Sequence, residues 1–142
     1  MTEEAVPELG PIDYVVVEWA DRQPSGEAIP HLVDLVDRGI IRILDLVFVT
    51  KDADGTVAEI AIDQLGAQFA VLEGANADLV GPDDVAEAAS VLEPGTSAAI
   101  LVYENSWAGP FAAALRRNGA QMVASGRIPI DALVETLDAV GA

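Results

Sequence analysis

The sequence predicts an α+β fold, a ferredoxin-like split βαββαβ sheet with a C-terminal αβα extension. Three observations lead to this prediction. Apolar runs alternate between strand-like and helix-like spacing, an Asp-Gly turn joins two adjacent strand-like runs, and no linker, repeat or low-complexity tract divides the chain. Two βαβ crossovers interleaved by a hairpin give the sheet order 4-1-3-2, with the helices on one face. We expect one domain, residues 12–142, after a flexible N-terminal tail, residues 1–11.

The first half of the chain supplies a strand, a helix and a hairpin. Residues 12–19 are rich in β-branched and aromatic side chains, as in a central strand covered on both faces. Aliphatic residues from 29 to 36 follow helical spacing, with Ser25 as the expected cap and Gly39 as the expected end. Strands over residues 41–50 and 58–62 then flank Asp54-Gly55, which is the strongest short hairpin signal in the sequence.

The second half repeats the alternation. Residues 66–81 show no clear pattern beyond a short apolar piece at 69–72. Gly81-Pro82 begins a helix that ends at Pro94-Gly95, and residues 98–103 form an apolar strand. A helix over residues 107–115, a short strand over residues 121–124 and a last helix that starts at Pro129 complete the extension. The total is five strands and four helices.

The charge and the composition exclude several function classes. The 142-residue chain carries 24 acidic and 7 basic side chains, a net charge of −17. Nucleic acid and anionic membrane surfaces are therefore excluded as partners, because both require clustered Lys and Arg. The absence of cysteine excludes disulfides and thiolate chemistry. An acidic start and the lack of a long uncharged apolar run predict a cytoplasmic protein.

Self-association is the expected way to cover the apolar face of the sheet. In the predicted topology the helices protect one face, and the aliphatic sides of the first and fourth strands are left on the other, which must pack on the C-terminal extension or on another subunit. Burying that face against a second copy would remove apolar area from water at about 25 cal/mol per Å². We therefore expect a homo-oligomer, with a basic protein as a further possible partner for the acidic surface.

Three phrases carry a resemblance to uncharacterised proteins. They are residues 48–57 (FVTKDADGTV), 92–99 (LEPGTSAA) and 103–107 (YENSW). They resemble a family of small proteins of high-GC Gram-positive bacteria known only as a domain of unknown function, from about Gly10 to the last helix. The chain is also distantly similar to a second uncharacterised family, often labelled membrane-associated. That family has a glycine-rich apolar stretch where this chain has a short segment with Glu73 and Asp78, which argues against a membrane role. Neither resemblance implies an activity or catalytic residues.

One candidate ligand site is an anion site in the LEPGTS turn. Gly95, Thr96 and Ser97 could offer backbone N–H groups and hydroxyls, and Arg116 and Arg127 could add positive charge. Residues 94–130 support this idea, because Glu104 is their sole acid against three arginines. The alternative is a plain helix-to-strand turn, since the segment lacks the lysine of a P-loop and precedes a strand.

Four further residues are candidates for buried or interface positions. Asp45 lies inside an apolar strand, where a carboxylate needs a partner, and Arg116 or Arg127 could form an ion pair with it. Glu18 and Glu104 each end an apolar strand near a tryptophan, Trp19 or Trp107. In the expected sheet these two glutamates lie at opposite edges, which argues against a paired-carboxylate site.

No catalytic, metal or cofactor site is predicted. The single histidine, His31, is expected on the surface without a metal partner, and Asp52 with Asp54 lacks the remaining ligands of a calcium loop. The leading hypothesis is a non-enzymatic assembly or interaction module. The alternatives are a protein that binds a small anionic ligand and a small enzyme that uses a carboxylate in a cleft.

Overall fold

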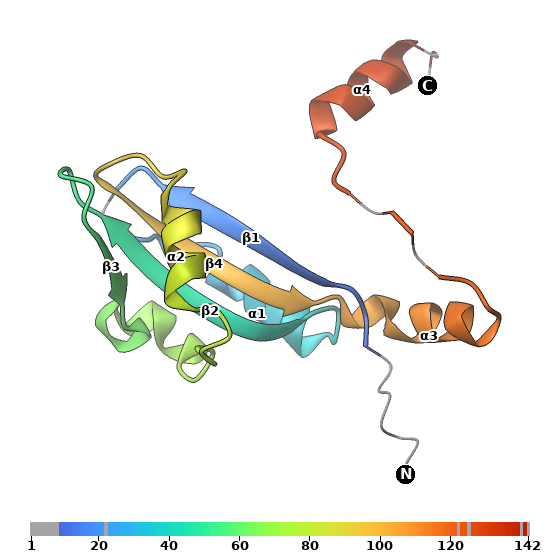
Figure 1. Cartoon of the computed structure of the whole chain (residues 1–142), viewed down its shortest axis with the longest axis horizontal. Coiled ribbons are helices and arrows are strands. Elements are labelled where there is room, and N and C mark those ends of the chain that lie inside the picture. The colour runs from blue at the N-terminus through green and yellow to red at the C-terminus, as the bar shows by residue number, and fades with distance from the viewer. Residues whose placement is uncertain (1–8, 22, 122, 125, 140, 142) are drawn as a thin grey trace.

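A computed structural model of the chain describes residues 9–21, 23–121, 123–124, 126–139 and 141 (Figure 1). Its strands are β1 (Ile12–Trp19), β2 (Arg42–Lys51), β3 (Val57–Ile60) and β4 (Thr96–Glu104). Its α-helices are α1 (Ile29–Asp37), α2 (Pro82–Ala89), α3 (Gly109–Arg117) and α4 (Ile130–Ala139). Short 3-10 helices are η2 (Ile62–Gln64), η3 (Ala67–Leu72) and η4 (Ser106–Ala108). The mixed α and β content agrees with the α+β class.

The sheet order is β1-β4-β2-β3, and each neighbouring pair is antiparallel. The expected pairing of the first and fourth strands and the expected hairpin between β2 and β3 are confirmed. The ferredoxin-like order 4-1-3-2 is wrong, because β4 inserts between β1 and β2. Burial explains the difference: β2 and β4 hold runs of five buried residues and occupy the centre. The first strand, expected in the centre, has no buried residue and lies at an edge.

The helices cover both faces of the sheet, which corrects the expectation of a single helical layer. Figure 1 shows α2 in front of the sheet and α1 behind it. One core joins Phe48 of β2 to Ile29 of α1 and Phe69 of η3, and the other joins Val49 of β2 to Val85 of α2. Successive side chains of β2 and β4 belong to opposite cores, because side chains along a strand alternate between the two faces of the sheet.

Local signals placed most elements close to their expected positions. Gly39 has a φ of 72° after α1, and Gly55 has a φ of 90° in the β2–β3 turn, both values that favour glycine. The cap of α1 is Ala28 and not Ser25, whose Oγ instead accepts a hydrogen bond from the Glu27 N–H at 3.3 Å. The apolar piece at 69–72 belongs to η3.

The C-terminal segment differs from the expected αβα extension. Gln121, Val123 and Ala124 have no strand conformation, and Met122 lies outside the described residues. A strand here would need an edge to pair with, and the segment runs away from the sheet between α3 and α4 (Figure 1). Of the N-terminal tail predicted over residues 1–11, positions 1–8 likewise lie outside the described residues.

Among the helices that the structure describes, none combines the length and the apolar character needed to cross a bilayer.

Candidate interaction surface

An apolar groove lies between α2 and the β1–β4 half of the sheet. It has a volume of about 690 Å³. Its floor is Val16 of β1 with Ile100 and Val102 of β4, and its sides include Tyr14 and Val91. The groove exists because α2 is only eight residues long and packs over β2 and β4, so the same face of β1 stays uncovered. Tyr14 and Val91 are 72% and 74% exposed.

Asp45 holds the loop before α2 in place, and α2 forms one wall of this groove. Its carboxylate is fully buried, and Oδ1 accepts hydrogen bonds from the N–H groups of Leu46 at 2.9 Å and Ala77 at 2.7 Å. Oδ2 accepts from the N–H of Val80 at 2.8 Å. A register shift between Ile43 and Asp45 interrupts the strand alternation. The expected ion pair with Arg116 or Arg127 is therefore replaced by bonds to backbone groups, which pin the loop that begins α2.

Two charged side chains hold the other end of α2. The Lys51 ammonium on β2 donates to the carbonyls of Ala89 and Leu92, each at 3.0 Å. These bonds satisfy carbonyls at a helix C-terminus, where a cation is favoured. Glu18 of β1 is exposed, and its Oε2 accepts a hydrogen bond from the Glu93 N–H at 2.8 Å. The groove wall is thus tied to the sheet at both ends.

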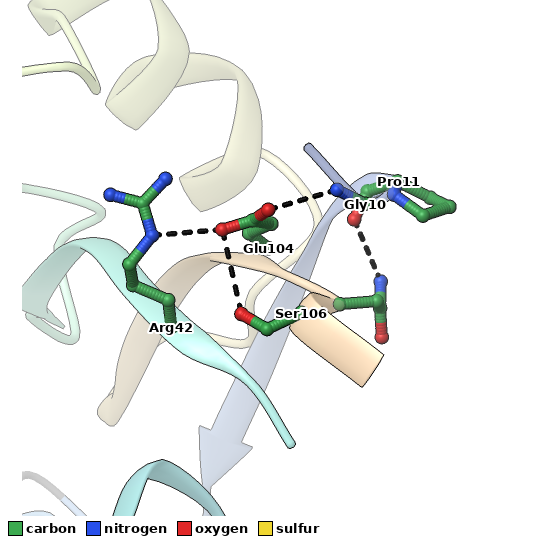
Figure 2. A network of polar contacts seen from close by, with 6 residues as sticks. Gly10, Pro11, Arg42, Glu104 and Ser106 are labelled. Carbon is green, nitrogen blue, oxygen red and sulfur yellow. Dashed lines mark hydrogen bonds and ion pairs between the residues drawn. The ribbon is translucent and has the colours of Figure 1, made fainter. Parts of the chain in front are cut away.

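Glu104 organises the end of the sheet from which the C-terminal residues leave (Figure 2). It is 4% exposed, and its carboxylate accepts from Arg42 Nε and from the Gly10 N–H, both at 2.8 Å. The Gly10 N–H and then Arg42 lower the pKa of the Glu104 carboxyl, against the effect of burial. A side chain at Gly10 would collide with the backbone of Asn105.

The residues after β4 are largely exposed. Trp107 of η4 and Phe111 of α3 are 64% and 65% exposed, and the Trp107 indole N–H donates to Asn105 Oδ1 at 3.3 Å. We call residues 118–139, as far as the structure describes them, the C-terminal arm. The arm ends in α4, which stands apart from the sheet in Figure 1 and has no buried residue.

The helix α4 presents an apolar stripe to solvent. Four aliphatic side chains share one side of it, at the 3, 4 and 7 spacing of a buried helical face. They are 44–76% exposed: Ile130, Leu133, Val134 and Leu137. The acids Asp131, Glu135 and Asp138 lie to one flank of this stripe. An amphipathic helix and an apolar groove are therefore both present in the same chain.

The structure places the residues of the predicted anion site on separate elements. Gly95, Thr96 and Ser97 lie where β4 begins, whereas Arg116 lies in α3, after β4 ends, and Arg127 lies in the arm. The Thr96 hydroxyl donates to the Glu93 carbonyl and the Ser97 hydroxyl to the Asp21 carbonyl, each at 2.7 Å. Gly95 has a φ of 83°, and its N–H donates to the Lys51 carbonyl. This segment therefore acts as a turn that enters β4.

The carboxylates considered for chemistry are also kept apart. Glu18 pairs with Ala98 and Glu104 with Ile12, so the two glutamates lie at opposite ends of the β1–β4 ladder. His31 is exposed on α1. In the described residues, no group of three or more His, Asp or Glu side chains is arranged to hold a metal ion.

Sequence reasoning missed the residues that build the groove. Lys51 reads as part of a turn, Leu79 lies in the segment without a clear pattern, and Val91 lies off the buried stripe of the expected helix. The sequence does carry a signal for Lys51. The last turn of α2 has no basic residue to bind its terminal carbonyls, so a lysine at a nearby strand end can bind them instead. The groove itself has no local signal, because its floor and wall come from three separate elements.

Comparison with known proteins gives a family but no function. A family model described as "Family of unknown function (DUF6325)" matches residues 8–142. The chain belongs to this family. No curated protein and no solved structure matches the chain. The DUF6325 match supports the expected resemblance to an uncharacterised family, and the groove and the arm lie inside the matched residues.

Proposed function

We propose that this DUF6325 protein is a non-enzymatic assembly module that forms a homo-oligomer through its C-terminal arm. The observation that carries the proposal is α4, an amphipathic helix of ten residues with no buried residue. Isolated helices shorter than about 12–15 residues are marginal in water, so α4 needs a surface to pack against. A second copy of the chain is the partner that is always present at matching concentration.

The strength of such an assembly follows from the apolar stripe. Full burial of a Val, Leu or Ile side chain stabilises by about 1.5–3 kcal/mol. The four stripe residues are roughly half exposed, so covering them would contribute about 3–6 kcal/mol per arm. Two arms would contribute about 6–12 kcal/mol, against an association cost of about 4–15 kcal/mol. The most favourable of these values leave about 8 kcal/mol, which corresponds to a dissociation constant of about 1 µM, so we expect association of about micromolar affinity or weaker.

Sedimentation velocity from about 1 to 200 µM tests the proposal, because this range begins at the tightest expected affinity and extends to weaker ones. The wild-type chain should shift from monomer to oligomer, and Leu133→Asp should stay monomeric. Val71→Asp is the matched control, because Val71 is 60% exposed on η3, away from the arm. A wild-type monomer throughout the range would overturn the proposal. An oligomer that Leu133→Asp leaves intact would show that the arm is not its interface.

A further inference from the structure

We infer that the groove between α2 and β1 is the acceptor for α4 of a second copy, so that two copies exchange their arms. This inference rests on the proposed homo-oligomer and names its binding site. The groove is apolar along its floor, at Val16, Ile100 and Val102, and α4 presents an apolar stripe of four aliphatic side chains. Within one chain both surfaces are exposed to solvent. Both are apolar, so each can bury the other.

The groove is prepared to receive a helix without rearrangement. Asp45 fixes the loop before α2, and Lys51 and Glu18 fix the segment after it. The wall therefore cannot collapse onto β1 without breaking several hydrogen bonds, two of them from the loop before α2 to the buried carboxylate of Asp45. Exposed apolar residues on the rim, Leu79 and Val91, extend the surface that an incoming helix would contact.

Charge restricts how the helix can lie. The α2 wall carries Asp84 and Glu87, both exposed, and α4 carries its acids on one flank. That flank must face solvent, because like charges across the contact would repel. Arg127 lies three residues before Ile130, the first residue of α4, and the sequence has no acidic residue between Glu104 and Asp131. We place Arg127 against the acidic wall of α2 in the exchanged arrangement.

The direction of the chain favours a second copy over docking in the same chain. After β4, α3 continues away from the end of the sheet, and the arm does not fold back over α2 (Figure 1). The twelve residues between α3 and α4 could span about 40 Å when extended, so their length allows reach to another copy. A reciprocal exchange uses the same contact twice and closes as a dimer, which prevents open chains.

A complementation experiment separates exchange from docking within one chain. Val91→Asp damages the groove and keeps the arm, and Leu133→Asp damages the arm and keeps the groove. Each variant alone should stay monomeric from about 1 to 200 µM, because a carboxylate buried without a partner in the contact costs far more than the lost aliphatic side chain and opens the contact. Val71→Asp, an exposed valine outside the groove, should match wild type.

Mixing the two damaged variants gives the decisive result. A mixed pair keeps one intact contact, the undamaged arm in the undamaged groove, whereas a pair of identical variants keeps none, because one buried aspartate already opens a contact. At concentrations well above the wild-type dissociation constant, donor- and acceptor-labelled variants should therefore show energy transfer that neither variant gives alone. Without transfer in the mixture, the exchange is refuted. If Val91→Asp associates as wild type does while Leu133→Asp does not, the groove is refuted as the acceptor but the arm-based oligomer stands. If wild type is a monomer, the proposed function itself fails.

A charge swap tests the orientation. Arg127→Glu should weaken association at low salt, and adding Glu87→Arg in the same chain should restore it. Dimerisation that Arg127→Glu leaves unchanged would refute the placement of Arg127 against α2.

Discussion

Replacing Asp45 with asparagine should destabilise the fold, because the buried carboxylate accepts hydrogen bonds from three backbone N–H groups. Those N–H groups belong to Leu46, Ala77 and Val80, at 2.7–2.9 Å. The amide in Asp45→Asn has nearly the same shape but one acceptor oxygen. If that oxygen keeps the two bonds of Oδ1, the amide NH₂ group faces the Val80 N–H, and two donors meet.

The magnitude follows from that lost bond. A hydrogen bond to a charged group contributes about 1.5–3 kcal/mol, and an unsatisfied buried N–H costs about 1–3 kcal/mol. Since these two effects partly overlap, we expect Asp45→Asn to lower the free energy of unfolding by about 2–5 kcal/mol. Typical domains have only about 5–15 kcal/mol in total. The variant should also loosen the loop that walls the groove, and so weaken association.

Urea unfolding followed by tryptophan fluorescence measures this change, with Trp19 as a reporter 6.4 Å from the Phe48 ring. Both proteins should carry Leu133→Asp, so that association does not add to stability. Asp63→Asn, an exposed aspartate in η2, is the control and should stay within about 0.5 kcal/mol of its parent. Amide hydrogen exchange should lose protection at Ala77 and Val80. An Asp45→Asn variant as stable as its control would refute the reasoning.

Two further substitutions test the polar contacts of Glu104 and Lys51. The pKa of the Glu104 carboxyl is lowered in the folded state. The ionised carboxylate therefore stabilises the fold at pH values above the unfolded pKa of about 4.3. This stabilisation is lost as the pH falls through the pKa of the folded state. Glu104→Gln should therefore be less stable than wild type in urea unfolding at pH 7, with a gap that narrows as the pH falls below the unfolded pKa; a gap independent of pH would contradict this. Lys51→Met keeps the apolar stem but removes the bonds to Ala89 at the end of α2 and to Leu92 after it, and should cost about 1–3 kcal/mol in thermal or urea unfolding. Arg38→Met, which breaks the exposed pair with Asp34 at 3.3 Å, is its control and should cost under about 0.5 kcal/mol; equal losses would show that Lys51 does not hold α2.

Short-range patterns in the sequence were sufficient to place most helices and strands. The Asp54-Gly55 turn defined the β2–β3 hairpin, and Gly81-Pro82 marked the start of α2. Each of these signals acts within a few residues, through a glycine φ, a proline at a helix start or the spacing of apolar side chains. For the same reason the stripe on α4 is recognisable from the spacing of its aliphatic residues alone.

The choice of neighbours in the sheet could not be made in this way. Residues 12–19 read as a covered central strand, yet β1 lies at the edge because β4 has five buried residues in succession and pairs with β2 as well. Asp45 shows the same limit. Its strand pattern indicates that a partner is needed, but the partner is the backbone of a loop more than thirty residues away.

The sequence by itself determined the charge, the hairpin, the apolar stripe of the last helix and the need of a buried aspartate for a partner, since each depends on residue type and local spacing. The tertiary structure alone decided the order of the strands, the two helical layers and the groove beside α2. These features come from elements distant in the chain, which meet only when the burial of all their faces is settled together.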